Sequence, residues 1–150
     1  MSDTGFKLRL TQQQNFQFLV EFLDTDIPPI TTDEPPPLGE NAGPNPSRML
    51  AAAVANCLAA SLMFALKKFK NEPDPVTVEV DVQMTRNEAK RLRVGAVSVA
   101  IQLGKSRAQF EHLDRVLEQF EDFCVVTQSV RDGFEVNVAV RDSEGVVLKG

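Results

Sequence analysis

The stretch that decides the fold runs from Asn45 to Lys70 and reads NPSRMLAAAVANCLAASLMFALKKFK. It predicts one long helix. Asn45 is a good N-cap, and Pro46 suits the first helical position because its ring presets the backbone and its missing N–H would be unpaired there. Lysines near the far end suit the negative end of the helix dipole, and Pro73 follows as a stop.

Within this helix, the apolar block Met49–Leu66 admits two interpretations. Its length is at the lower limit of a membrane span, which needs about 17–25 residues. Alanine richness, the internal polar residues Asn56 and Ser61, and basic flanks favour instead a helix buried at the centre of a core. We therefore predict a buried core helix and no membrane partner.

The length of the helix also predicts a homodimer. A helix of about 25 residues is roughly 37 Å long, which exceeds the ~30 Å diameter of a small domain. One chain offers only this helix, one further helix and some short strands, too little to enclose Met49–Leu66 on every side. A second copy packed through the same face would complete the enclosure.

Composition narrows the class of protein. The chain has 150 residues, 43% apolar and 25% charged, and a net charge of −5, which predicts one globular domain over residues 1–150. The acidic balance disfavours a nucleic-acid partner. A single histidine excludes a multi-histidine metal site within one chain, and no cofactor motif is present. No secretory signal is visible at the start, so we expect a cytoplasmic protein with reduced cysteines.

Hydrophobic periodicity predicts an α+β fold in the order ββ-α-ββ-α-ββ, without repeats. Between the first hairpin and the long helix, a proline-rich stretch of about twenty residues reads as a loop suited to covering a pocket. The alternation of the fourth strand changes phase near Gly95, as a bulge would cause. The predicted strands are 6–10, 15–23, 76–85, 92–103, 134–140 and 146–148, and the second helix is 107–123.

Cys57 and Cys124 carry the candidate chemistry. Cys57 lies in the middle of the long helix, where an inert core residue is the plainer interpretation. Cys124 opens the segment CVVTQSVR, which could start a fresh helical turn whose amides favour a thiolate. His112 could form a dyad with either cysteine, although a partly exposed helix histidine is the simpler interpretation. Gly104-Lys105-Ser106 lacks the earlier glycine of a phosphate loop.

Two blocks resemble the cysteine motifs of the OsmC/Ohr family. The first is Pro37-Leu38-Gly39 followed by GPNPSRMLAAA at 43–53 and Asn56-Cys57-Leu58; the second is FCVVTQSVR at 123–131. The resemblance implies an intertwined homodimer with a long, buried central helix. It also implies reduction of organic hydroperoxides, an antioxidant role in the oxidative stress response. Cys57 would attack the peroxide, Cys124 would resolve the sulfenic acid to a disulfide, and a dithiol would restore both.

The chain departs from that family at three places. Ser47 stands where active members have a glutamate, Val125 stands where a proline is usual, and the strand NFQFLVEFL lacks the N-terminal arginine. Cys57 then needs another cation to favour its thiolate. Arg9 and Arg48 are candidates, but Arg131 is preferred, because it matches an arginine of the family and shares a motif with Cys124. The predicted site is therefore Cys57, Cys124 and Arg131.

Two functions remain open from the sequence. The first is a thiol-dependent redox enzyme, a candidate organic hydroperoxide reductase with peroxiredoxin-like activity that uses the Cys57 and Cys124 pair. The alternative is a non-peroxidase OsmC-like dimer that binds a small apolar ligand or partner and has unactivated thiols. A purely structural dimer is a third and weaker interpretation.

Overall fold

The computed structural model describes residues 4–150 and shows an α+β protein, as predicted. Its internal contacts fall into two compact units, Met1–Ala55 with Glu79–Ala100, and Asn56–Val78 with Ile101–Gly150. Each unit is described by itself below. Both cysteines belong to the second unit.

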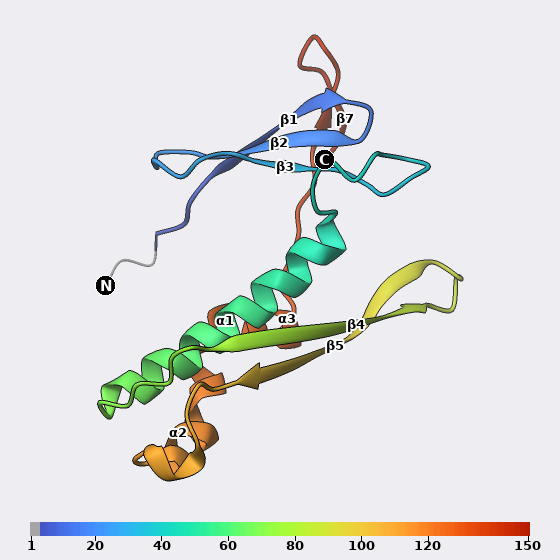
Figure 1. Ribbon diagram of the computed structural model, residues 1–150. Helices are drawn as coiled ribbons and strands as arrows, with labels where there is room; N and C mark the ends of the chain where they lie inside the picture. The colour runs from blue at the N-terminus through green and yellow to red at the C-terminus, as the bar shows by residue number, and fades with distance from the viewer. Residues whose placement is uncertain (1–3) are drawn as a thin grey trace. The chain divides into compact units, whose positions relative to one another are not determined.

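The first unit contains a three-stranded antiparallel sheet of β1 (Leu8–Gln14), β2 (Gln17–Phe22) and β3 (Ile30–Thr32), in that order (Figure 1). The predicted hairpin is confirmed, and its turn falls at Asn15, where φ is 48°. Asparagine tolerates this left-handed conformation better than most residues. β3 lies in a stretch that we predicted to be a loop. Its three residues are too few to show the alternation of apolar and polar side chains that identifies a strand.

After β3, Asp33 organises the proline-rich loop. Its carboxylate accepts hydrogen bonds from the backbone N–H groups of Glu34, Glu40 and Ala42, at 2.8, 3.0 and 3.1 Å. The side chain is only 4% exposed, so these three donors replace the water that it has lost. The loop is therefore a hydrogen-bonded structure and not an open tether.

The helix α1 (Pro46–Lys68) confirms the predicted long helix. The backbone N–H of Arg48 donates to Oδ1 of Asn45 at 3.0 Å, which confirms Asn45 as the N-cap. At the other end, Lys70 takes a positive φ of 62° and the buried Asn71 donates its side-chain amide to the Leu66 carbonyl at 3.2 Å. The helix thus ends two residues before the predicted end.

α1 is long and apolar enough to cross a membrane by length and composition alone, a test that the core helices of soluble proteins also pass. Within the chain, 33% of its most apolar window is buried. Leu58, Leu62 and Leu66 are buried, while Phe64 is 69% exposed. A single chain therefore leaves much of the apolar surface of this helix uncovered.

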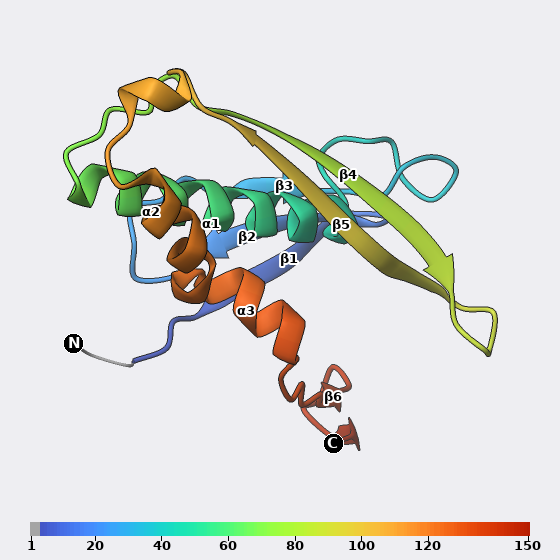
Figure 2. The ribbon, with the colours of Figure 1, turned by 90° about the horizontal axis from the view of Figure 1, so that it is seen from below.

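A long antiparallel hairpin of β4 (Thr77–Arg86) and β5 (Leu92–Gln102) follows, as predicted (Figure 2). At Gly95, an added Cβ would lie 2.9 Å from Cγ2 of Thr85, so this position in β5 has no room for a side chain. The apolar side chains of β4 stay partly exposed, Val80 by 38% and Met84 by 45%.

The core of the second unit forms where α1 meets α2 (Leu113–Gln119). Leu62, Leu66 and Val116 are its buried centre. Partly buried apolar residues surround them: Ala65, Phe69, Ile101, Leu103, Phe110, Leu113 and Phe120. Phe110, Leu113, Val116 and Phe120, which recur at helical spacing, thus pack on one side, whereas Leu117 is 42% exposed.

The prediction of one continuous helix over 107–123 is wrong. The segment divides into a 3₁₀ turn at Arg107–Gln109, then α2, then a second 3₁₀ turn at Phe120–Phe123. His112 breaks the helix because its φ of 59° is left-handed. A further helix, α3 (Val125–Asp132), confirms that the segment after Cys124 starts a fresh helical turn.

The last hairpin is shorter than predicted. It consists of β6 (Val140–Arg141) and β7 (Val147–Lys149), whereas the predicted strand began at Phe134. Phe134 and Val136 are 73% and 72% exposed, and this alternating run carries no strand pairing within the described residues 4–150. Alternation predicts a strand only where a neighbouring backbone can accept its hydrogen bonds.

Candidate active site at two cysteines

Cys57 lies on a helix face that lines a groove. The groove-lining residues of α1 recur at helical spacing: Cys57, Ala60, Ser61, Phe64, Ala65 and Lys68. Cys57 itself is half-buried and is a free thiol. One face of α1 thus presents a partly accessible sulfur at the edge of a cavity.

Cys124 is the second free thiol, and it is completely buried. It is the residue directly before α3, with extended backbone angles of φ −82° and ψ 98°. Its Sγ lies 3.0 Å from Oγ1 of Thr127, in the first turn of that helix. Thr127 is also buried, so the two side chains are partners in a dry environment.

The surroundings of Cys124 favour its thiolate. Burial raises the pKa of this thiol, but hydrogen bonds from the Cys57 side chain, from the side chain and backbone of Thr127, and from Ser61 together hold the pKa below its ordinary value. Cys57 and Cys124 are therefore neighbours in the fold. Since they lie 67 positions apart in the sequence, the fold is what creates this pair.

Sequence reasoning missed Ser61 and Thr127. Ser61 follows Cys57 by four residues and Thr127 follows Cys124 by three, the spacings that place side chains on the same face of a helix. A hydroxyl one turn beyond each cysteine was the available signal. This pattern is too common in helices to identify a site residue from the sequence.

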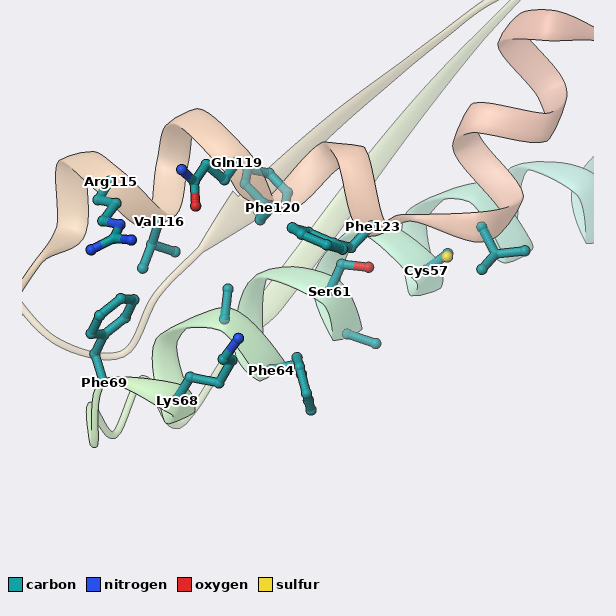
Figure 3. A pocket seen from close by; sticks show the side chains of 13 residues that line it. Cys57, Ser61, Phe64, Lys68, Phe69, Arg115, Val116, Gln119, Phe120 and Phe123 are labelled. Carbon is teal, nitrogen blue, oxygen red and sulfur yellow. The ribbon is translucent and has the colours of Figure 1, made fainter. Parts of the chain in front are cut away.

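The groove beside Cys57 has a volume of about 580 Å³ and is mostly apolar (Figure 3). Its second wall comes from α2 and the segment after it, through Arg115, Val116, Gln119, Phe120, Phe123 and Val125. Phe123 lies at the end near Cys57, whereas Arg115 and Phe69 lie at the opposite end. The groove can therefore hold a small, largely apolar molecule against the sulfur.

Arg131, the third predicted site residue, lies in α3 and forms an ion pair. Its Nη2 is 2.7 Å from Oε1 of Glu121, and both side chains are about half exposed. The guanidinium thus reaches back along α3 to the 3₁₀ turn that precedes Cys124. A role for Arg131 at Cys57 stays a prediction.

The other candidate cations belong to the first unit. Arg9 lies in β1 opposite Glu21, and Arg48 lies in the first turn of α1. Ser47 and Arg48 line a different groove, of about 770 Å³, together with Val80 and Met84 of β4. Ser47, which stands at the position of the family glutamate, therefore lines this second groove and not the groove at Cys57.

His112 has a structural contact. Its ring centre lies 4.9 Å from that of Phe69, at the C-terminal end of α1. Among residues 4–150, no group of three or more His, Cys, Asp or Glu side chains could hold a metal ion.

The fold and this pair of cysteines define an α+β protein with two neighbouring free thiols beside an apolar groove. The family model for OsmC-like protein matches residues 39–139, and the chain belongs to that family. This match includes both cysteine blocks.

Solved structures share the fold. An osmotic stress induced and detoxification response protein from Psychrobacter arcticus is 22% identical, with a TM-score of 0.67 over 86% of this chain and 91% of that one. The organic hydroperoxide resistance protein OhrB of Bacillus subtilis is 20% identical, with a TM-score of 0.60 over 88% and 96%. An organic hydroperoxide resistance protein OsmC from Legionella pneumophila is 17% identical, with a TM-score of 0.60 over 87% and 92%. No curated protein matches.

Proposed function

We propose that this protein reduces organic hydroperoxides with Cys57 and Cys124, in the cytoplasm where thiols stay reduced. The observation that carries the proposal is that Cys57 lines an apolar groove and lies near enough to Cys124 to lower the pKa of that buried thiol. Membership of the OsmC-like family, with hydroperoxide resistance proteins among its structural neighbours, supports the same chemistry.

The two cysteines have different roles in this proposal. Cys57 lines the groove and is half-buried, so a ligand can reach its sulfur. Cys124 is fully buried, which suits a group that reacts with a neighbouring residue and not with a diffusing peroxide. Cys57 is therefore the attacking residue and Cys124 the resolving residue.

The reaction runs in two steps. The Cys57 thiolate attacks one peroxide oxygen, the O–O bond breaks, the alkoxide leaves and takes up a proton, and Cys57 becomes a sulfenic acid. The Cys124 thiolate then attacks Sγ of Cys57, the S–O bond breaks, and hydroxide leaves and is protonated to water. One hydroperoxide and two thiols give an alcohol, water and a disulfide, which an external dithiol reduces by exchange.

We also propose that the working form is a homodimer. Large apolar side chains remain exposed in both units, among them Phe64, Phe123, Phe134, Val136 and Met84. An isolated two-stranded hairpin such as β4–β5 is marginal in water unless something covers it. A second copy would bury these surfaces, and a solution mass near the single-chain 16.6 kDa at micromolar concentration would contradict the dimer.

Peroxide turnover tests the catalytic proposal. The wild type should consume cumene hydroperoxide in the presence of dithiothreitol, and Cys57→Ser should abolish the reaction. Cys124→Ser should form a sulfenic acid on Cys57, trapped by dimedone, but no intramolecular disulfide. The proposal fails if the wild type shows no turnover, or if Cys57→Ser keeps the wild-type rate while circular dichroism shows it folded.

The size and apolar lining of the groove favour a second candidate function, binding of a small apolar ligand by a dimer with unactivated thiols. Iodoacetamide separates the two functions. A Cys57 that alkylates no faster than an ordinary thiol at neutral pH, with no disulfide after peroxide treatment, supports the binding function.

A further inference from the structure

Cys124 lies at a corner between two helical segments of the chain. The 3₁₀ turn Phe120–Phe123 precedes it and α3 follows it, while its own backbone is extended (Figure 2). Rotation about the two soft backbone dihedrals of such a residue changes the angle between the segments and moves its side chain. The position of the buried sulfur therefore depends on what fixes this corner.

Three hydrogen bonds close a ring around the corner. The backbone N–H of Cys124 donates to the Glu121 carbonyl, and the backbone N–H of Gln128 donates to the Cys124 carbonyl, both at 3.0 Å. The side-chain amide of Gln128 then reaches back to the same Glu121 carbonyl, also at 3.0 Å. A carbonyl oxygen has two lone pairs, so Glu121 can accept both bonds. Gln128 thus joins α3 directly to the turn before Cys124.

The hydrogen bond of Gln128 is better protected from water than the other side-chain link across this corner. It is partly buried, whereas the ion pair of Arg131 with Glu121 has side chains 51% and 46% exposed. Solvent screens an exposed ion pair and leaves it individually weak. A hydrogen bond is electrostatically stronger where the surroundings are less polar than water. The amide of Gln128 is therefore the side-chain group that fixes the corner.

A fixed corner matters for the pair of thiols. Cys57 is held on its side by the regular hydrogen bonds of α1, a helix of 23 residues. Two groups that are both held in place react at a higher effective concentration than groups that must first find each other. A disulfide also forms only in a narrow geometry, with Cα atoms about 4.4–6.8 Å apart. Added freedom at Cys124 would therefore slow disulfide formation and make the disulfide less stable.

We propose that Gln128 is a positioning residue for Cys124, and that its side-chain hydrogen bond to Glu121 keeps the sulfur of Cys124 beside Cys57. The inference rests on the proposed function, in which Cys124 resolves the sulfenic acid of Cys57. Within the described residues, Gln128 does not line the groove at Cys57, so it acts through Cys124 and not on the peroxide. It therefore affects the second step of the reaction and leaves the first step unchanged.

Gln128→Met tests this assignment, because methionine keeps an unbranched side chain of similar helix propensity and removes the amide. Reduced protein is mixed with cumene hydroperoxide, quenched in acid at short times, and sorted by mass spectrometry into thiol, sulfenic acid and disulfide forms. The sulfenic acid should form at the wild-type rate. Its conversion to the disulfide should slow roughly 3- to 10-fold, as expected for the loss of one hydrogen bond. Gln128→Glu, whose carboxylate cannot donate to a carbonyl at neutral pH, should show the same pattern.

Gln109→Met is the matched control. Gln109 also closes a turn of this unit, since its Oε1 accepts from the backbone N–H and the hydroxyl of Ser106, at 3.0 and 3.1 Å. Its loss removes comparable hydrogen bonds outside the corner, so both steps should keep their wild-type rates. The proposal is overturned if Gln109→Met slows the second step as much as Gln128→Met does. It is also overturned if Gln128→Met slows the first step or leaves the second unchanged.

A glutathione equilibrium tests the same residue without peroxide. Reduced protein and glutathione disulfide exchange to give the disulfide of Cys57 with Cys124 and two reduced glutathione molecules. The effective concentration of the thiol pair, obtained from this equilibrium, should fall roughly 3- to 10-fold in Gln128→Met and stay unchanged in Gln109→Met. If the wild type does not turn over peroxide, the proposed function fails, but a lowered effective concentration still supports the positioning role. Equal effective concentrations in the wild type and Gln128→Met would refute that role.

Discussion

The Sγ of Cys124 lies 3.0 Å from Oγ1 of Thr127, and both side chains are buried. A hydroxyl in that position donates to a thiolate and accepts from a thiol. Because burial alone would raise the pKa of Cys124, the hydrogen bonds of Cys57, Thr127 and Ser61 are what reverse the direction. Thr127 is thus a positioning residue for the thiol of Cys124, the resolving residue of our proposal.

Thr127→Val should raise the pKa of Cys124, because valine has the shape of threonine but removes the hydroxyl. The thiolate fraction of Cys124 at neutral pH then falls. Disulfide formation after peroxide addition should slow roughly 3- to 10-fold. The pKa can be followed by the ultraviolet absorbance of the thiolate across pH, with Cys57→Ser as the common background.

Two further variants accompany this test. Thr127→Ser should restore the lowered pKa because it returns the hydroxyl. Ser129→Ala removes a hydroxyl from the same helix and should leave the pKa of Cys124 unchanged, since Ser129 does not contribute to its shift. If Thr127→Val leaves the pKa of Cys124 unchanged, Thr127 does not favour the thiolate and this prediction is wrong.

The ion pair of Arg131 and Glu121 gives a test of the predicted cation. If Arg131 favours the thiolate of Cys57, Arg131→Met should slow alkylation of Cys57 at neutral pH. Glu121→Gln should speed it, because the carboxylate that partly neutralises the guanidinium is lost. We expect changes of about 2- to 5-fold in opposite directions, as an exposed pair is screened by solvent.

Arg107→Met is the matched control for this pair. Arg107 and Asp114 form the other ion pair of the described chain, at 2.6 Å, with side chains 71% and 78% exposed. That variant should leave the alkylation rate unchanged. Equal alkylation rates of Cys57 in the wild type and the three variants would show that Arg131 stabilises α3 and does not act on Cys57.

Local signals predicted much of this fold. Asn45, Pro46 and the apolar run after them define α1, because a cap and a helical period are properties of neighbouring residues. The β4–β5 hairpin followed from alternation in the same way. The break at His112 did not, because its left-handed backbone interrupts a stripe that is apolar on both sides of it.

The candidate site was predicted only in part. The two cysteine blocks marked Cys57 and Cys124, but a hydroxyl one turn beyond a cysteine is too common to show that Ser61 and Thr127 act on the buried sulfur. The groove could not be predicted from the sequence either, because it forms between α1 and a distant segment of the chain that carries Arg115 and Phe123. Contacts between distant segments depend on packing, which a local period does not encode.

The carboxylate of Asp33 should make stability depend on pH. The hydrogen bond from Glu40 lowers its pKa most, burial opposes this, and hydrogen bonds from Ala42 and Glu34 lower it further. Because the folded-state pKa is below the unfolded value near 3.8, the stabilisation is present above that pH and is lost as pH falls through the folded pKa.

Asp33→Asn should therefore lower the midpoint of thermal unfolding at neutral pH by about 2–4 °C, and the difference from wild type should shrink in acid. Differential scanning calorimetry across pH measures both quantities. Asp26→Asn, at an exposed position of the loop between β2 and β3, should have no such effect. A constant difference between Asp33→Asn and wild type down to strongly acidic pH would contradict the role of the carboxylate charge.

Gly39 and Gly43 should be intolerant of a single added methyl group. A Cβ at Gly39 would collide with the carbonyl oxygen of Glu34, and one at Gly43 with that of Thr31. These are backbone atoms that cannot rotate away, and the Asp33 hydrogen bonds hold the loop in place around them. Gly39→Ala and Gly43→Ala should each lower the free energy of unfolding by about 1–3 kcal/mol in urea titrations. Gly5→Ala, where nothing lies within 4 Å of the new atom, should leave it unchanged or slightly raised. If both loop variants keep the wild-type free energy of unfolding, the loop backbone can shift to accommodate the methyl group and is not held in a fixed conformation.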